Sequence, residues 1–441
     1  MRKRNIRLQL TALILLAAFA VLCTSPAFAT GEEPDGDLPA VILTQGQDEA
    51  SAGAAAGEMA TDVAAAAAAN PHETIATTVQ ENSRFSAPQL ELPCRNALLI
   101  CIDTGDILYA KEPDAEVPMA SITKVMTLLL TLEAVEAGKI SMTDIVPISE
   151  HAFNMGGSQI WLEPGERFTL DELIKAICVS SANDAAVAVA EYVGGSEPVF
   201  AEMMNARAAE LGMTHTHFVN ACGLDAPGHY SSARDVALMS LALLHHPKIL
   251  EYSGIWTDTL RGGQTQLTNT NKLLKSYAGI TGLKTGTTNG AGVCISASAV
   301  RDGMGLLAVV LGSPSSKERF AAAKILLDYG FAAFETGSVP EIAGRAQTLS
   351  VMGGVAREAE LVYAVPEKLL LKKGEGQTLT ASVALPQQLK APVSAGTQVG
   401  TVTLKAGEEI LGEYPVAIRA DIPQMDWSTA LSLFLEALFT L

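Results

Sequence analysis

The chain has few aromatic residues, little positive charge and few long apolar segments. Of its 441 residues 5% are aromatic, and 30 Lys and Arg are outnumbered by 48 Asp and Glu, giving a formal net charge of −18. This excess would repel a phosphate backbone, so general nucleic-acid binding is excluded. Beyond the N-terminus no run reaches the roughly 18–20 apolar residues that a spanning helix needs. A polytopic membrane protein is therefore excluded, although 48% of the residues are hydrophobic.

Cysteine and histidine are also scarce, and neither forms a recognisable pattern. The cysteines beyond the N-terminal apolar segment are odd in number and scattered among apolar neighbours, which does not make a disulfide framework. Buried free thiols are expected, with a pair between Cys94 and Cys101 left open. His215 and His217 lie close together, but the sequence has no His-Glu-x-x-His. We expect no metal and no cofactor.

The N-terminus has the three parts of a secretory signal peptide. Basic residues at positions 2–7 precede the apolar stretch 13–22, and residues 27–29 form an A-x-A cleavage site. Residues 1–29 are therefore predicted to be removed on export, with an uncleaved anchor as the alternative. Residues 30–90 are rich in Ala, Gly, Glu and Asp without steady periodicity. They are predicted to form a disordered acidic spacer.

Hydrophobic patterning further along the chain predicts an α+β fold. Alternating apolar residues around turns predict β-hairpins at 97–109 and 292–311, and a helix is expected from Ser121 to Ala137. Further helices are expected at 170–178, 184–193, 198–211, 233–246 and 316–329. Helices on a sheet built mainly of hairpins define one domain, residues 91–336. Short β-rich runs between turns predict a small all-β domain at 337–424.

The last segment, residues 425–441, predicts an amphipathic helix. Its apolar face would consist of Trp427, Leu431, Phe434, Leu435 and Leu438. As a helix, the fifteen residues 427–441 span about 22 Å, which is too short for a hydrocarbon core of about 30 Å. We expect it to lie in the membrane interface as a peripheral anchor. Because it lacks Lys and Arg, docking on the all-β domain is the alternative.

Three short motifs each occur once and in a fixed order. S-x-x-K occurs at Ser121–Lys124, S-x-N at Ser181–Asn183, and K-T-G at Lys284–Gly286. A serine hydroxyl is a weak nucleophile until a neighbouring base takes its proton. Residues three apart on a helix lie on the same side, so Lys124 is predicted beside Ser121.

Lysine is a base only when it is neutral, and three features favour the neutral form of Lys124. These are burial, the nearby Lys284 and the positive end of the helix. The helix start also directs the N–H of Ser121 toward a developing oxyanion. An ordinary helix start would leave Lys124 without reason in an apolar run, so we favour the catalytic interpretation.

The other two motifs supply polar groups for a relay and for substrate binding. Ser181 and Asn183 offer a hydroxyl and an amide that can pass a proton and hold the base. Lys284 and Thr285 lie where an edge strand is expected, and they can hold the terminal carboxylate of an extended substrate. A helix cap at Ser181 and a plain edge-strand charge at Lys284 are the structural alternatives.

Together these motifs resemble the penicillin-binding serine acyltransferases, which are described through S-x-x-K and K-T-G. Segments 118–127, 181–185, 223–225 and 230–235 are similar to those of low-molecular-mass D-alanyl-D-alanine carboxypeptidases of peptidase family S11. The resemblance covers roughly residues 90–420. It implies a β-lactamase/transpeptidase-like domain, an antiparallel sheet flanked by helices, followed by the small all-β domain.

The resemblance also implies roles for the motif residues in catalysis. Ser121 would be the acylated nucleophile and Lys124 its base. Ser181 would pass a proton to the departing D-alanine, and Asn183 would orient Lys124 and the substrate amide.

Substrate binding would fall to the K-T-G strand. Lys284 and Thr285 would bind the terminal carboxylate, and Gly286 and Thr287 would continue the substrate-binding strand. The N–H groups of Ser121 and Thr287 would form the oxyanion hole.

The implied partners are a peptidoglycan stem peptide ending in D-Ala-D-Ala, β-lactams as covalent inhibitors, and a membrane surface contacted by the C-terminal helix. The expected location is the outer face of the cytoplasmic membrane or the cell wall. Cys222 stands where a histidine is expected before Gly-Leu, which leaves the local turn in question.

Three other functions remain as alternatives. A class A β-lactamase has compatible motif spacing, but no Glu-x-x-Leu-Asn lies between the second and third motifs. A peptidoglycan transpeptidase and a catalytically silent wall-binding module are the other two.

Overall fold

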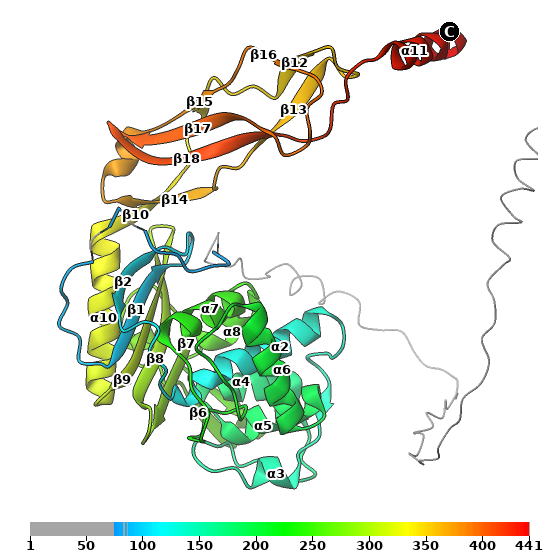
Figure 1. Ribbon diagram of the computed structural model, residues 1–441. Helices are drawn as coiled ribbons and strands as arrows, with labels where there is room; N and C mark the ends of the chain where they lie inside the picture. Colours follow the sequence, from blue (N-terminus) through cyan, green and yellow to red (C-terminus); the bar gives the residue numbers. More distant parts are fainter. Residues whose placement is uncertain (1–74, 83, 86, 441) are drawn as a thin grey trace, which may run out of the picture. The chain divides into compact units, whose positions relative to one another are not determined.

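The computed structural model describes residues 75–82, 84–85 and 87–440. Its central element is a five-stranded antiparallel sheet with the strand order β2-β1-β9-β8-β7 (Figure 1). The strands are β1 (Asn96–Cys101), β2 (Ile107–Lys111), β7 (Ile280–Thr288), β8 (Gly292–Arg301) and β9 (Met304–Ser313). β1 is buried along its whole length, because helices cover both faces of the sheet.

Alternate residues of the strands contribute to two separate hydrophobic cores. Leu98 and Ile100 of β1 pack with the larger helical group, whereas Leu99 packs with α10 (Ser316–Ala333). This alternation follows from the two-residue period of a strand. K-T-G lies on the edge strand β7. One face of the sheet packs on the helical group, which carries the other two motifs.

Residues before β1 also contact this domain. Ala76 N donates to Ile102 O, and Gln80 N donates to Gly105 O. Phe85 and Leu90 pack against the α10 core. The predicted spacer 30–90 is therefore wrong for its described end, because these apolar side chains and backbone groups have partners on the domain. Residues 30–74 lie outside the described part.

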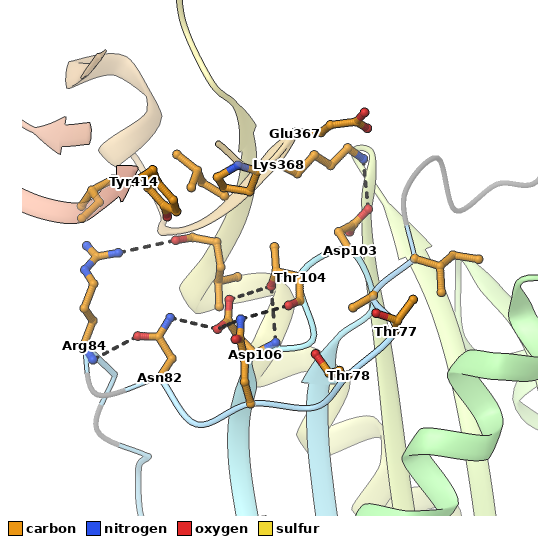
Figure 2. Close-up of a pocket in the computed structure, with 17 residues that line it drawn as sticks. Thr77, Thr78, Asn82, Arg84, Asp103, Thr104, Asp106, Glu367, Lys368 and Tyr414 are labelled. Atoms are coloured by element: carbon orange, nitrogen blue, oxygen red, sulfur yellow. Dashed lines mark hydrogen bonds and ion pairs between the residues drawn. The ribbon is translucent and has the colours of Figure 1, made fainter. Parts of the chain in front are cut away.

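A cavity of about 520 Å³ lies next to this segment (Figure 2). Its lining includes Asp103, Asp106 and Lys368, and Lys368 Nζ lies 3.0 Å from Asp103 Oδ1. Asp106 accepts hydrogen bonds from Gln80 and Asn82. No residue of the three motifs lines this cavity, and the three charged side chains named here all have bonded partners.

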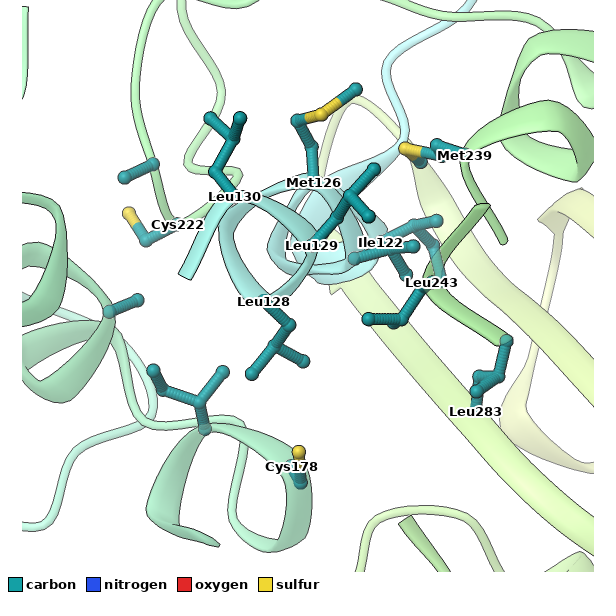
Figure 3. Packing of buried hydrophobic residues seen from close by; sticks show 14 of the residues in the cluster. Ile122, Met126, Leu128, Leu129, Leu130, Cys178, Cys222, Met239, Leu243 and Leu283 are labelled. Atoms are coloured by element: carbon teal, nitrogen blue, oxygen red, sulfur yellow. The ribbon is translucent and has the colours of Figure 1, made fainter. Parts of the chain in front are cut away.

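The helical group surrounds α2 (Lys124–Glu136), which is apolar on nearly every side (Figure 3). A helix of this kind is stable only when it is buried. Around it lie the longer helices α4 (Leu170–Val179), α5 (Asn183–Gly194), α6 (Glu197–Glu210) and α7 (Ala233–Leu244). Shorter elements complete the group: α3 (Glu150–Phe153), α8 (Lys248–Ser253), α9 (Leu273–Ser276), β3 (Ile145–Val146), β4 (Phe168–Thr169), β5 (Thr257–Leu260) and β6 (Thr265–Thr268).

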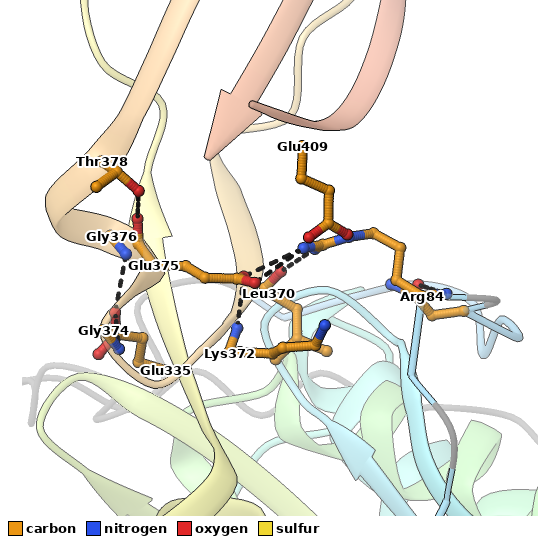
Figure 4. A network of polar contacts seen from close by, with 10 residues as sticks. Arg84, Glu335, Leu370, Lys372, Gly374, Glu375, Gly376, Thr378 and Glu409 are labelled. Atoms are coloured by element: carbon orange, nitrogen blue, oxygen red, sulfur yellow. Dashed lines mark hydrogen bonds and ion pairs between the residues drawn. The ribbon is translucent and has the colours of Figure 1, made fainter. Parts of the chain in front are cut away.

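Residues after α10 form the second, all-β region. β10 (Phe334–Ser338) pairs with β14 (Lys368–Lys372). A seven-stranded sheet has the order β11 (Ile342–Ala343), β15 (Leu379–Ala384), β17 (Gln398–Ala406), β18 (Glu409–Ile418), β13 (Glu358–Tyr363), β12 (Thr348–Met352) and β16 (Gln388–Lys390). Arg84 forms ion pairs with Glu375 and Glu409 of this region (Figure 4).

The final helix is α11 (Trp427–Thr440), as expected from the sequence. Trp427 is 79% exposed, and Leu431 and Leu435 are 40% and 44% exposed. Among the described residues, none of the helices combines the length and the apolar character needed to cross a membrane.

The predicted α+β fold class is confirmed, with the all-β region after the helical and mixed part. The six helices expected between residues 121 and 329 are present. The five cysteines of the described part are free and buried, so the open pair between Cys94 and Cys101 is not formed.

Candidate active site

Ser121 lies in a short 3₁₀ turn, η1 (Ala120–Thr123), immediately before α2. Lys124 is the first residue of α2 and is completely buried. Its Nζ lies 3.0 Å from Ser121 Oγ. The spacing of three residues therefore brings the two groups together, as the sequence predicts.

Two other acceptors hold the amine of Lys124. Nζ donates to Asn183 Oδ1 at 2.6 Å and to the carbonyl oxygen of Cys222 at 2.6 Å. Burial lowers the pKa of Lys124 to about 8, although Cys222 and Asp184 act in the opposite direction. A neutral amine needs only two acceptors and has a lone pair left for the Ser121 hydroxyl. The site can therefore hold Lys124 as a base.

The second motif lies at the start of α5. Ser181 has a positive φ of 60° just before the helix, and its Oγ accepts a hydrogen bond from Lys284 Nζ at 2.8 Å. Asn183 Nδ2 donates to Gly156 O, which fixes the amide so that its oxygen faces Lys124. Ser181 is not the cap of α5, because Ala182 occupies that position without a side-chain bond.

The third motif lies on β7, where a strand was predicted. Lys284 is 2% exposed, and its Nζ also donates to Thr285 O at 2.8 Å. Burial and then the charge of Lys124 lower the pKa of Lys284 well below its usual value. The buried amines of Lys124 and Lys284 repel each other, so both do not keep a full charge without an anion beside them.

Gly286 allows β7 to approach the Ser121 turn closely. A Cβ at this position would lie 2.9 Å from both Met119 O and Ser121 N. Because of these short distances, the third residue of K-T-G must be glycine for the strand to pack this near to Ser121. The next residue, Thr287, is exposed.

Further residues of the site carry no motif and were missed in the sequence. Thr285 Oγ1 donates to Thr270 Oγ1 at 2.6 Å. Arg319 of α10 donates to Gly286 O and Cys294 O, and burial lowers its pKa to about 10. The group of Cys222 that accepts the hydrogen bond from Lys124 is a backbone carbonyl, so it cannot be predicted from the residue type.

The turn at Cys222, questioned from the sequence, is well formed. Asn220 Oδ1 accepts from the backbone N–H of Cys222 and of Gly223. Cys222 contributes its carbonyl oxygen, so the histidine expected there is not needed for the contact with Lys124.

The chain belongs to the D-alanyl-D-alanine carboxypeptidase family, whose model matches residues 81–315. The model of the penicillin-binding protein 5 C-terminal domain matches residues 334–424. The D-alanyl-D-alanine carboxypeptidase DacF of Bacillus subtilis is 41% identical over 356 residues, which are 80% of this chain and 91% of the relative.

Solved structures agree with this assignment. Penicillin-binding protein 5 of Haemophilus influenzae has a TM-score of 0.70 and 30% identity, covering 77% of this chain and 100% of its own. Penicillin-binding protein D2 of Listeria monocytogenes in its ampicillin-bound form has a TM-score of 0.51 and 33% identity, covering 55% of this chain and 100% of its own.

Proposed function

We propose that the protein removes the terminal D-alanine from peptidoglycan stem peptides through an acyl-enzyme on Ser121. The observation that carries this proposal is the environment of Lys124. Its amine lies 3.0 Å from Ser121 Oγ, and Asn183 and Cys222 accept its other hydrogen bonds. Membership of the carboxypeptidase family supports the same reaction.

Acylation begins when Ser121 Oγ attacks the carbonyl carbon of the penultimate D-alanine. Its proton moves to Lys124 Nζ as the new C–O bond forms, which is general base catalysis of a serine nucleophile. The N–H groups of Ser121 and Thr287 stabilise the negative oxygen. The closeness of Gly286 to Ser121 N supports an oxyanion hole shared between the two elements.

The C–N bond then breaks and the terminal D-alanine leaves. Ser181 Oγ gives its proton to the departing amine and receives in return the proton that Lys124 took from Ser121. Water next attacks the ester carbonyl and Lys124 takes its proton. As the ester C–O bond breaks, Lys124 gives that proton to Ser121 Oγ, and the shortened peptide is released.

The terminal carboxylate is held by Lys284, Thr285 and the strand of Gly286 and Thr287. Lys284 is buried beside a second amine, so its charged form gains strongly when an anion arrives. The carboxylate of a β-lactam offers the same charge, and a β-lactam acylating Ser121 would stay bound. The ampicillin-bound form of the Listeria relative supports β-lactam binding.

The test is release of D-alanine from a pentapeptide of the L-Lys or diaminopimelate type, together with a penicillin adduct on Ser121. Ser121→Ala is expected to abolish both, whereas Ser276→Ala, an exposed serine outside the site, is expected to keep both. Release that survives Ser121→Ala contradicts the proposal.

The same assays separate the alternatives. Fast penicillin turnover would indicate a β-lactamase, and preferential transfer to an amine would indicate a transpeptidase. An adduct without D-alanine release would indicate a wall-binding module.

We further propose export through the signal peptide at 1–29, which lies outside the described residues, and peripheral attachment through α11. The exposed Trp427, Leu431 and Leu435 support an interfacial helix. Removing residues from Pro423 onward is expected to move the protein from the membrane fraction to the soluble fraction. Unchanged attachment after this truncation would contradict the anchor.

A further inference from the structure

The residue before Ser121 has a backbone conformation that side-chain-bearing residues rarely adopt. Ala120 has a φ of 52°, in the left-handed region. Such a conformation persists only where the surrounding structure holds it. Because Ser121 follows directly, the contacts that hold Ala120 also set the direction of the serine Oγ and N–H.

A pair of buried side chains supplies such contacts. Thr123 Oγ1 donates to Ala120 O at 2.9 Å, closing the turn around Ser121. The same Oγ1 lies 2.8 Å from Nε2 of His229. The other ring nitrogen, Nδ1, accepts from Val219 N at 3.0 Å, so Nε2 carries the proton and donates to Thr123.

Both side chains are inaccessible to solvent and do not touch Ser121 Oγ. Thr123 is 0% exposed and His229 is 4% exposed. Burial lowers the pKa of His229 to about 4, so the ring is neutral at neutral pH and Nδ1 remains an acceptor. The hydrogen-bond directions are therefore constant around neutral pH.

The loop that His229 holds reaches Lys124 as well. Val219, bonded to the ring, is three residues from Cys222, whose carbonyl accepts from Lys124. The next residue, Gly223, packs on the Ser121 turn, since a Cβ there would lie 2.0 Å from Ala120 O. One histidine thus connects the serine turn and the loop that bonds the base.

We propose that Thr123 and His229 are positioning residues for acylation: His229 holds the Thr123 hydroxyl, which holds Ala120 O and so aims Ser121 Oγ at Lys124. This inference rests on the proposed function, because it assumes that Ser121 is acylated. Neither residue exchanges a proton with the substrate. Their effect is on the geometry of the attack.

The test uses penicillin acylation under saturating conditions, which separates the maximal acylation rate from the apparent binding constant. Thr123→Val, which removes the hydroxyl, is expected to lower the maximal rate about tenfold or more with binding unchanged. Thr123→Ser keeps the hydroxyl and is expected to retain most of the rate. Rates are expressed per folded molecule, with the folded fraction measured by thermal unfolding.

A matched control is Thr131→Val on the same helix. Thr131 is also completely buried, and its hydroxyl donates to Thr127 O within α2. It is expected to lower stability without changing the acylation rate. A merely structural role for Thr123 would give the same result as Thr131, and this outcome would overturn the proposal.

A second pair of variants tests the histidine and covers the case in which Thr123→Val does not fold. His229→Gln keeps one donor and one acceptor and is expected to stay within a few-fold of the wild-type rate, whereas His229→Leu is expected to lose about tenfold. Equal rates for the two variants would overturn the proposal. If the wild-type protein forms no adduct, the proposed function itself fails, and this inference with it.

Discussion

The two buried lysines lie in different surroundings, and the difference separates their roles. Lys124 Nζ lies beside Ser121 Oγ and donates to Asn183 and to the carbonyl of Cys222, and burial leaves its pKa at about 8. Lys284 bonds Ser181 Oγ and Thr285 O, and nearby cationic groups add to burial in lowering its pKa. The two lysine side chains therefore differ in their hydrogen-bond partners and in the groups that lower their pKa values.

The first environment suits a base and the second suits an anion receptor. With a pKa of about 8, Lys124 would exchange a proton near neutral pH in the proposed mechanism, where general base catalysis is most effective. Lys284 has most to gain from an incoming carboxylate, because that anion offsets both burial and the neighbouring positive charge. Global charge is a poor guide here, since a chain with a net charge of −18 can still bind an anion locally.

The largest expected effect comes from removing the base while keeping a positive charge. Lys124→Arg is expected to lower the rate of acylation by about 1000-fold or more, because a guanidinium does not accept the serine proton. Stopped-flow acylation by a penicillin measures this. Lys272→Arg, at an exposed lysine outside the site, is the control, and a variant that acylates normally would contradict the role of Lys124.

Removing the anion receptor is expected to have a selective effect. Lys284→Met should lower the turnover of a peptide with a free C-terminal carboxylate by about 100-fold, because a buried charge pair loses one partner. The same peptide with an amidated C-terminus should change much less. Equal losses for both peptides would mean that Lys284 acts on another step.

The pH dependence sharpens the comparison further. The pKa of Lys124 is lowered to about 8, and the neutral form is the base, so acylation should rise with pH and level off above this value. Below pH 8 the rate should fall by about tenfold per pH unit. In the proposed mechanism a bound carboxylate favours the charged form of Lys284. A rate that is independent of pH between 6 and 9 would contradict the assignment.

The smallest expected effect comes from moving β7, which carries Lys284, away from the turn that carries Ser121. Gly286→Ala places a Cβ 2.9 Å from Ser121 N, so β7 must move away from the serine turn. Acylation should fall by about fivefold, since small displacements of reacting groups are costly. An unchanged rate would show that the strand position is not limiting.

Much of this site could be predicted from the sequence because helix spacing brings Lys124 beside Ser121, and because K-T-G marks a strand. The contacts from Cys222, Thr123 and His229 could not. The first is a backbone carbonyl, and the contact between Thr123 and His229 depends on a loop from a distant part of the chain packing on the serine turn.

The fold was predictable in the same way, with local patterns giving the helices and hairpins. The start of the domain was misplaced because residues 75–90 have little regular periodicity. The described residues of this segment, 75–82, 84–85 and 87–90, are held by hydrogen bonds to the β1–β2 hairpin and by the packing of Phe85, which are tertiary contacts.

The most direct measurement of the central claim is peptide mapping of the penicillin adduct in the wild-type protein and in Lys124→Arg. We predict a single adduct on Ser121 in the wild-type protein that forms far more slowly in the variant. An adduct on another residue, or equal rates of formation in the two proteins, would contradict the account.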